Sequence, residues 1–323
     1  MSAPDVSAPG AVPALYQIRF PVRIDDVDAV FQAVDEASES IAVFEEEGRW
    51  FCELLVRHTP DLDELAWRLS RSLGEDSPGE GEMAVEALDD ADWLEATRRS
   101  FPPFQVGRFW VHGSHVQVQP PPDAVQLAFD AGLAFGTGEH GSTQGCLLAL
   151  DQLLRRRRFR RILDMGCGSA ILAVAATKCQ PSARALAVDI DPQAVRVAAD
   201  NAVRNGVATR LRTAVANGYD RPALRRAGRF DLIFANILAG PLCAMAGSLA
   251  HALSTGGTAV VSGLISNQTE AVLLAHRRQG LTLVHHLTVG SWSTLVFDKQ
   301  RARPLRRPLP NPFTVEAWPT RIV

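Results

Sequence analysis

The chain has 323 residues, of which 46% are hydrophobic, and its formal net charge is only −3. This length allows two folded units with separate cores. No apolar run reaches the roughly 20 residues of a membrane-spanning helix, and the first residues lack a signal-peptide pattern, so we expect a cytoplasmic protein without membrane contact. The five cysteines form no CxxC or CxxxC pair, which argues against a disulfide framework and against bound metal.

Charge is divided unevenly along the chain. Residues 1–95 hold 6 basic and 23 acidic side chains (−17), whereas residues 96–323 hold 27 basic and 13 acidic ones (+14). The acidic front section should repel nucleic acid phosphate and attract a cationic partner. A surface that merely keeps the protein soluble explains the same charge equally well.

The front section shows the β-α-β-β-α-β order of a split-βαβ, ferredoxin-like α+β domain. Val27, Val30 and Val34 recur at helical spacing, and the breaker-rich residues 74–82 indicate a loop. We expect strands at 15–22, 41–46, 49–58 and 83–88, and helices at 25–38 and 61–74.

In the second part, strand and helix patterns alternate, and four of the strands are apolar on both faces, as buried parallel strands are. This pattern predicts a Rossmann-like, doubly wound α/β domain, and two final strand-like runs, at 281–290 and 292–299, suggest an antiparallel finish. The predicted parts are a disordered N-terminus (1–14), the ferredoxin-like domain (15–88), a connector (89–114), the α/β domain (115–299) and an Arg/Pro-rich tail (300–323).

Two motifs of the second part together indicate an adenosyl ligand. Asp164 to Ala170 form a glycine-rich turn after the first parallel strand, and Asp189 ends the next strand 21 residues after Gly168. Glycine lets a ligand approach the backbone, and a carboxylate at that place can accept both hydroxyls of a ribose. Ile171 stands where a dinucleotide fingerprint needs glycine, and no GK[ST] follows, so phosphate binding is disfavoured.

Two further segments are candidates for the same site. Asn236 closes the fourth strand, where its carbonyl could orient a substrate amine, although a turn or a helix cap explains such an asparagine as well. The glycine-rich loop 134–143 precedes the turn and could fold over a cofactor, with His140 as a candidate only.

The chain resembles the PrmA family, bacterial methyltransferases of the ribosomal large-subunit protein numbered eleven. The similarity runs over nearly all of residues 15–299, and its motifs together are highly specific. They are Asp92-Trp93 with Phe101-Pro102, the loop 134–143, and the segments 164–176, 188–195, 200–207 and 235–242.

The resemblance implies a recognition domain, a connector and a seven-stranded methyltransferase domain that transfers methyl groups from S-adenosylmethionine to lysine side chains and an N-terminal amine. By position, the family's cofactor contacts fall on Thr143, Gly166, Asp189 and Asn236, and we add Gly168 from the turn itself. We take Asn236 as the amine-orienting residue. The chain departs from the family pattern at three positions: Glu139, Gly141 and Ala170.

Other functions stay open at this point. Methylation of another protein, such as the beta subunit of electron-transfer flavoprotein, is the nearest alternative, and a non-catalytic adenosyl-ligand sensor belongs to a different class. A nicotinamide oxidoreductase is disfavoured by Ile171. We expect a monomer that binds a basic ribosomal protein and that binds neither a membrane nor a specific nucleic acid. The arginine run 155–158 leaves an RNA contact open.

Overall fold

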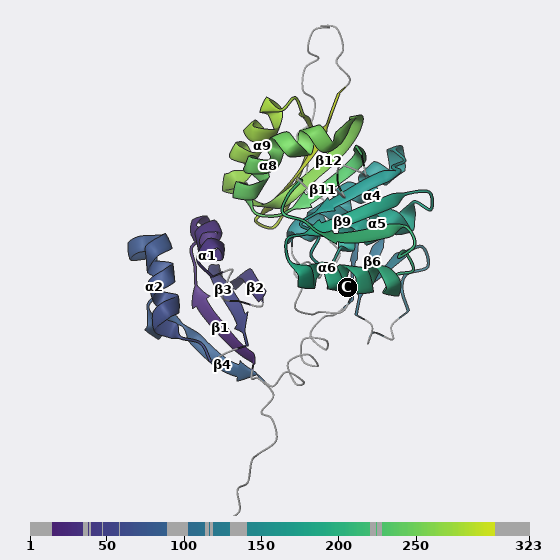
Figure 1. The fold of residues 1–323 in the computed structure, drawn as a ribbon. Coiled ribbons are helices and arrows are strands. Elements are labelled where there is room, and N and C mark those ends of the chain that lie inside the picture. Colours follow the sequence, from purple (N-terminus) through teal and green to yellow (C-terminus); the bar gives the residue numbers. More distant parts are fainter. Residues whose placement is uncertain are drawn as a thin grey trace, which may run out of the picture. The chain divides into compact units, whose positions relative to one another are not determined.

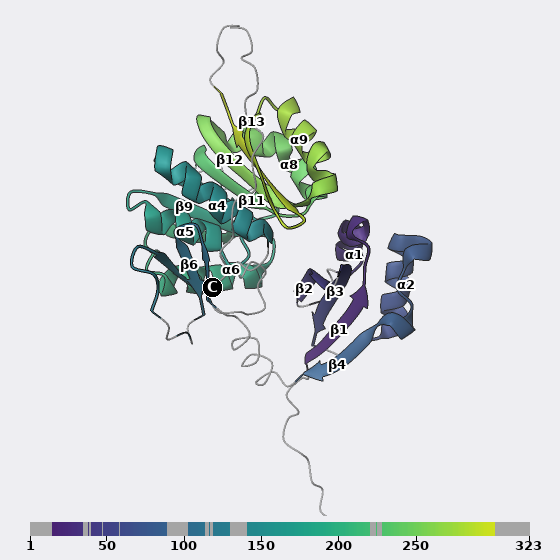
Figure 2. The same cartoon turned by 180° about the vertical axis from the view of Figure 1, so that it is seen from behind.

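The structure is a computed structural model, and its helices and strands divide the chain into two compact units, residues 1–100 and residues 101–323. Figures 1 and 2 show the two units from opposite sides. The structure describes residues 15–34, 38, 40–46, 48–57, 59–88, 103–113, 116, 119–129, 141–219, 224 and 228–300. The predicted disordered N-terminus, the tail beyond residue 300 and most of the loop 134–143 therefore lie outside the described residues.

The first unit has the element order β-α-β-β-α-β expected from the sequence, with short 3-10 turns added. Its four strands form one antiparallel sheet in the order β2-β3-β1-β4. The helices pack over one face of this sheet, where Ile18, Phe20 and Cys52 join Val30 and Leu69 in a buried core. The elements are β1 (Leu15–Pro21), α1 (Val27–Val34), β2 (Ser40–Glu46), β3 (Arg49–Val56), α2 (Leu62–Leu73) and β4 (Ala84–Leu88).

The second unit is built on a seven-stranded sheet in the order β10-β9-β8-β11-β12-β14-β13. The first five of these strands pair in parallel, and the last two pair antiparallel, which is the finish predicted from the sequence. The hydrophobic pattern does not predict β10, because Arg212 and Thr213 interrupt its short apolar run. The strands are β8 (Arg161–Met165), β9 (Arg184–Asp189), β10 (Leu211–Val215), β11 (Phe230–Asn236), β12 (Leu253–Ile265), β13 (Thr282–Val289) and β14 (Trp292–Asp298).

Helices cover both faces of this sheet, so the central strands are buried on both sides (Figure 1). The cluster on one face includes buried side chains of α4, α5 and α6, and the cluster on the other includes those of α8 and α9. This two-sided burial is why the central strands read as almost continuously apolar. The helices are α4 (Gly141–Arg156), α5 (Ile171–Cys179), α6 (Pro192–Arg204), α8 (Ala239–Ala252) and α9 (Thr269–Arg278).

A small three-stranded sheet extends the second unit. It consists of β5 (Phe104–Val106), β6 (Phe109–His112) and β7 (Val125–Ala128), in that order. The predicted connector (89–114) includes residues 104–112, but these residues form two strands whose side chains Val106, Phe109 and Val111 join the core beside α4 and α5. The exact domain boundaries stay a prediction.

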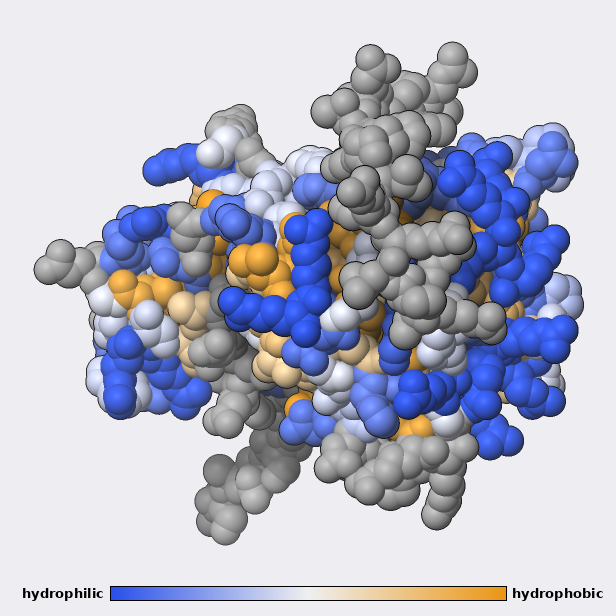
Figure 3. Space-filling view, turned by 90° about the horizontal axis from the view of Figure 1, so that it is seen from above, coloured by the Kyte–Doolittle hydropathy of each residue, from blue (hydrophilic) through white to orange (hydrophobic). Residues whose placement is uncertain are grey.

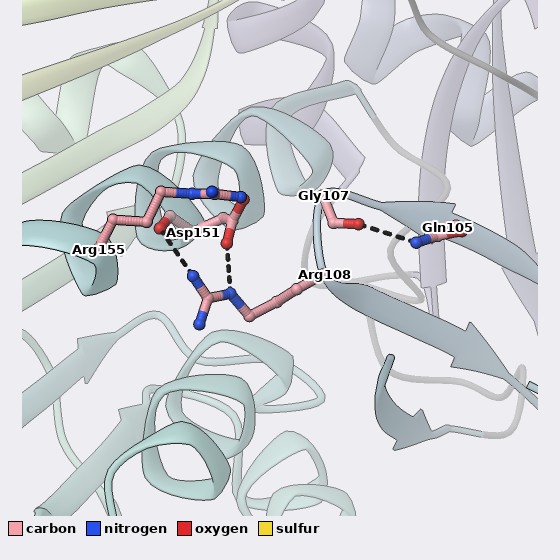
Figure 4. A network of polar contacts seen from close by, with 5 residues as sticks. All are labelled: Gln105, Gly107, Arg108, Asp151 and Arg155. Atoms are coloured by element: carbon pink, nitrogen blue, oxygen red, sulfur yellow. Dashed lines mark hydrogen bonds and ion pairs between the residues drawn. The ribbon is translucent and has the colours of Figure 1, made fainter. Parts of the chain in front are cut away.

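An ion-pair network fastens this small sheet to α4 (Figure 4). Arg108 donates to the carboxylate of Asp151, which is 9% exposed and also accepts from Arg155 at 3.0 Å. At the turn between β5 and β6, the side chain of Gln105 donates to the carbonyl of Gly107 at 3.0 Å. The small sheet is thus held by both apolar and ionic contacts.

Hydrophilic side chains predominate on the face seen in Figure 3, with smaller hydrophobic groups between them. No helix in the described ranges is long and apolar enough to cross a membrane. The same ranges contain no group of three His, Cys, Asp or Glu side chains that could hold a metal ion. All five cysteines are free.

Candidate functional site

The glycine-rich turn after β8 has the backbone shape that its sequence predicts. Gly166 has a φ of +64° and Gly168 a φ of +49°, both in the left-handed region that glycine adopts without strain. A Cβ atom at Gly166 would overlap with Cγ2 of Ile237, just beyond β11, so the two strand ends approach closely. Ala170 also has a positive φ, of 61°, and is the one such residue other than glycine in the described part of the chain.

Asp189 ends β9 and is joined directly to this turn. One oxygen of its carboxylate accepts the Gly168 N–H at 2.8 Å, and the other accepts the Asp191 N–H at 3.1 Å. The structure therefore brings together the two motifs that the sequence linked by spacing alone. A carboxylate offers about four acceptor positions, so two of them are left for the hydroxyls of a ligand.

The helix that follows β9 is anchored to the same turn. The carboxylate of Asp191 caps the first turn of α6 by accepting the N–H groups of Gln193 at 2.7 Å and Ala194 at 3.0 Å. One helix turn before the end of α6, the buried Asn201 donates its amide to the carbonyl of Ser169 at 3.0 Å. Together these bonds fix the glycine turn relative to its neighbours.

Asp164, the first residue of the turn motif, lies buried beneath the turn. Its carboxylate accepts the N–H of Ala173, in the first turn of α5, at 2.9 Å. Burial raises the pKa of Asp164 to about 8, the Ala173 hydrogen bond opposes this rise, and the negative charge of Asp189 adds to it. The only sequence signal for this role was its position as the first residue of the turn motif.

Asn236 and Thr143 meet beside the turn. Asn236 ends β11 one position after the pair Met165 and Ala235, so it lies level with Gly166. Its Nδ2 donates to Oγ1 of Thr143, in the first turn of α4, at 3.3 Å. Its Oδ1 is buried and has no hydrogen-bond partner among the described residues. A buried acceptor without a partner costs free energy, and a ligand N–H or O–H would satisfy it.

A polar network beneath the start of α4, which the sequence did not indicate, supports Thr143. Oγ of Ser262, on β12, lies 2.8 Å from Oγ1 of Thr294, 2.9 Å from the Ser293 carbonyl oxygen and 3.3 Å from the Ser142 carbonyl oxygen. All four side chains are buried. The first turn of α4 is thus held against β12 and β14 by hydrogen bonds as well as by packing.

The three positions that depart from the family pattern, Glu139, Gly141 and Ala170, have different structural surroundings. Ala170 takes up the left-handed conformation that a third glycine would adopt more easily. At Gly141, a Cβ atom would lie 2.8 Å from both Cδ1 of Trp292 and the carbonyl oxygen of Val289, so the small residue makes room for the β13–β14 hairpin. Glu139 lies outside the described residues, as does the candidate His140.

Comparison with known proteins identifies the family. The family model described as ribosomal protein L11 methyltransferase (PrmA) matches residues 22–300. A protein of that name from Bradyrhizobium diazoefficiens is 40% identical over 277 residues, which are 84% of this chain and 92% of the relative. The chain belongs to this family. A relative from Brucella suis with the same name is 41% identical over 262 residues, which are 81% of this chain and 90% of the relative.

A solved structure agrees with PrmA membership. The ribosomal protein L11 methylase of Lactobacillus delbrueckii subsp. bulgaricus matches with a TM-score of 0.54 and 27% identity, and the match covers 62% of this chain and 100% of that one. The second unit therefore has the α/β fold of a methyltransferase. The predicted cofactor, S-adenosylmethionine, is in keeping with this family.

The residues at this end of the sheet fit an adenosyl cofactor. The turn has a left-handed backbone at Gly166 and Gly168, and Asp189 keeps free acceptor positions beside it. Asn236 adds a buried acceptor on the other side of the turn. In this PrmA-family chain, all five residues predicted from the sequence lie on elements that converge at the carboxyl ends of β8, β9 and β11.

Proposed function

We propose that this chain transfers methyl groups from S-adenosylmethionine to amino groups of ribosomal protein L11, on lysine side chains and on the N-terminus. The observation that carries the proposal is the free Oδ1 of Asn236, which is buried while Nδ2 of the same amide is held by Thr143. An acceptor fixed in this way can take a hydrogen bond from an amine and aim its lone pair.

We also propose which residues hold the cofactor. Gly166 and Gly168 would lie against it through their backbone, and Asp189 would accept hydrogen bonds from its ribose hydroxyls. Thr143 would border it from the start of α4, and Asn236 from the end of β11. The support for this assignment is the direct bond between Gly168 and Asp189, which gives turn and carboxylate one fixed geometry.

The chemistry asks the protein mainly to position the amine and to exclude water. When bound, the cofactor supplies a methyl group on a sulfonium, a leaving group that is already activated. A lysine amine has an ordinary pKa of about 10.4 and must lose its proton before it can attack. Removing the amine from water favours its neutral form, and Asn236 then orients it, so no dedicated general base is needed.

The first test measures transfer directly. The purified chain is incubated with methyl-labelled S-adenosylmethionine and unmethylated L11, and mass spectrometry locates the label. We expect label on lysine side chains and on the N-terminal amine. Label on another protein of a ribosomal extract, with L11 unlabelled, would refute the proposed substrate, and cofactor binding without any transfer would favour an adenosyl-ligand sensor.

Asn236→Ala tests the role of the free acceptor. We expect kcat to fall by about 10- to 100-fold, because a misplaced amine rarely reaches the attacking geometry. Cofactor affinity, measured separately by titration, should change much less. Gln152→Ala removes an amide farther along α4 and serves as the control. Unchanged turnover of Asn236→Ala at saturating cofactor and L11 would exclude the assigned role.

We propose that the first unit, which we assign to the ferredoxin-like fold, recognises the substrate. Its β-α-β-β-α-β order and acidic composition support this role, because complementary charge speeds the capture of a basic protein. Asp61 and Asp63 are exposed at the start of α2. We expect association with L11 to slow as salt rises, and a rate that stays flat would contradict electrostatic capture.

Trp67 on α2 is the residue of this unit best suited to anchor a partner. Its side chain is 53% exposed, and the guanidinium of Arg71 lies 5.1 Å from the centre of its ring. Tryptophan and arginine are the residue types that most often dominate binding energy at interfaces. We therefore expect Trp67→Ala to raise KM for L11 with kcat unchanged, whereas Leu274→Ala, at another exposed apolar residue, should leave KM as it is.

A further inference from the structure

Exposed arginines gather where the central parallel strands of the second unit begin. Arg161 is the first residue of β8 and Arg184 the first residue of β9. Arg160 precedes β8, and Arg229 precedes β11. All four side chains are exposed, and we call this group the arginine edge. The arginine edge lies at the amino ends of the strands whose carboxyl ends carry the candidate site.

Backbone pairing makes the arginine edge continuous. Arg161 and Arg184 are partners in the β8–β9 register, and the N–H of Arg184 donates to the carbonyl of Arg160 at 2.8 Å. On the other side, a Cβ atom at Gly228 would lie 3.1 Å from Nη2 of Arg161, which places Arg229 next in the row. Three neighbouring strands span about 10 Å at the usual spacing of 4.7–4.9 Å.

No carboxylate in the described part of the chain forms an ion pair with these four side chains. The nearest acid along the chain, Asp231, accepts the backbone N–H groups of Arg160 and Arg161 at 2.8 and 2.9 Å instead. The neighbouring Arg157 differs, because it pairs with Asp298 at 3.0 Å. The arginine edge therefore presents positive charge that the fold itself leaves largely uncompensated.

Helix electrostatics explain only the adjacent cations. Arg155 and Arg156 lie in the last turn of α4, where positive charge complements the helix dipole. A β-sheet has only a small net dipole, so arginines at the starts of strands gain no comparable stabilisation. Four exposed guanidinium groups on neighbouring strands also repel one another. Neither a helix dipole nor an ion pair accounts for this arrangement.

We propose that the arginine edge binds the phosphodiester backbone of a nucleic acid without reading its base sequence. Guanidinium groups bind phosphate oxygens through paired hydrogen bonds, and a row of them matches a chain of regularly spaced phosphates. The proposal goes beyond methyl transfer and does not depend on it. The acidic front section sets a limit to this binding, since it repels phosphate near the first unit.

The location of the arginine edge leaves the candidate site free. Asp189 and Asn236 lie at the carboxyl ends of strands of six and seven residues, roughly 17 and 20 Å from the amino ends at about 3.3 Å per residue. A nucleic acid bound at the amino ends would therefore not compete with a cofactor beside Asp189. This separation provides a direct check, because cofactor affinity should be the same with and without the nucleic acid.

The test uses the full chain and two fluorescein-labelled hairpins of the same sequence, one of RNA and one of DNA. Fluorescence anisotropy measures binding without cofactor over a range of salt concentrations. We expect both hairpins to bind. The triple variant Arg160→Gln/Arg184→Gln/Arg229→Gln should bind on the order of tenfold more weakly at physiological salt, and the slope of log K against log salt should fall by about 3 units.

The control removes the same number of charges elsewhere. Arg196→Gln/Arg277→Gln/Arg278→Gln changes three exposed arginines on α6 and α9, and it should bind like the unsubstituted chain. Equal losses of hairpin affinity in both triple variants would mean that only net charge matters, and would overturn the proposal. Binding to only one of the two hairpins would overturn it as well. If the unsubstituted chain binds anionic phospholipid vesicles but neither hairpin, the surface is a membrane contact and the proposal is wrong.

The single variant Arg184→Gln guards against a folding defect in the triple variant. It should lower the salt slope by about 1 and leave the thermal unfolding midpoint unchanged. Methylation of free L11 should also stay the same in all these variants, because none of the substituted residues belongs to the candidate site. An unchanged salt slope in Arg184→Gln would contradict a phosphate contact at that residue.

Discussion

The two ends of the central strands carry polar groups of opposite character. At the carboxyl ends, Asp189 and Asn236 are fixed by hydrogen bonds to Gly168 and Thr143, and each keeps an acceptor to spare. At the amino ends, the four side chains of the arginine edge are exposed and form no ion pair with a carboxylate of the described residues. Fixed, partly buried acceptors suit a small ligand that must be held in one pose, whereas exposed charges suit a large partner bound through its net charge.

The largest effect is expected at Gly166, where the glycine turn of the carboxyl-end site lies closest to Ile237. Gly166→Ala adds a Cβ that overlaps with Ile237 and forces a left-handed backbone on alanine. We expect a loss of roughly 2–5 kcal/mol in the free energy of unfolding, from backbone strain and overpacking together. Denaturant unfolding measures it.

A matched glycine separates the two causes. Gly206 has a similar φ of +69°, but nothing lies within 4 Å of the added Cβ. Gly206→Ala should therefore cost only the strain, about 1–2 kcal/mol. Equal costs at the two positions would mean that the close approach of the turn to Ile237 contributes nothing.

The second-largest effect is expected at Asp189, the carboxylate at the end of β9. Asp189→Ala removes the acceptor for the Gly168 N–H and the proposed acceptor for the ribose. We expect cofactor affinity to fall roughly 100-fold, close to 3 kcal/mol, which calorimetric titration would measure. Asp200→Ala, at an exposed carboxylate on α6, is the control and should leave affinity unchanged. Similar affinities for both variants would remove Asp189 from the site.

Asp164 makes the stability of the chain depend on pH. Its pKa in the folded state is about 8, whereas an unfolded carboxyl titrates near 3.9, so the folded state holds the extra proton between these values. The stabilising contribution is complete below about pH 4 and is lost as pH rises toward 8, by up to about 1.4 kcal/mol per pH unit.

Asp164→Asn tests this dependence. Asparagine keeps an oxygen that can accept the Ala173 N–H but does not ionise. Unfolding followed between pH 5 and pH 8 should lose less stability in the variant than in the unsubstituted chain. Parallel pH profiles of the two proteins would show that Asp164 does not hold its proton in the folded state.

The sequence predicted much of the carboxyl-end site because its signals are local. A glycine turn, an acid 21 residues after Gly168 and an asparagine after an apolar strand each stand out within a few residues. The role of Asp164 depends on burial, and the support from Ser262 depends on strands far apart in the chain. Neither has a local pattern from which it could be predicted.

The arginine edge was beyond sequence reasoning for a related reason. Arg160, Arg184 and Arg229 are separated by 24 and 45 positions, and only the parallel register of β8, β9 and β11 places them side by side. The more prominent signal in the sequence is the arginine run 155–158, although Arg155 and Arg157 are paired with carboxylates. The small sheet of β5, β6 and β7 escaped prediction because its strands have only three or four residues.

The smallest expected effect concerns Ala170, where three terms nearly cancel. Ala170→Gly removes the backbone strain of a left-handed alanine, which stabilises the folded state by about 1–2 kcal/mol. Two terms oppose this gain: the greater entropy of the unfolded chain costs about 0.4–1 kcal/mol, and the loss of a buried methyl group costs about 0.8 kcal/mol. We therefore expect the free energy of unfolding to change by less than about 1 kcal/mol. Cofactor affinity should stay the same, since the turn already has its left-handed shape. A large gain in affinity would mean instead that alanine distorts the turn, and that the departure at this position tunes the site rather than being tolerated by it.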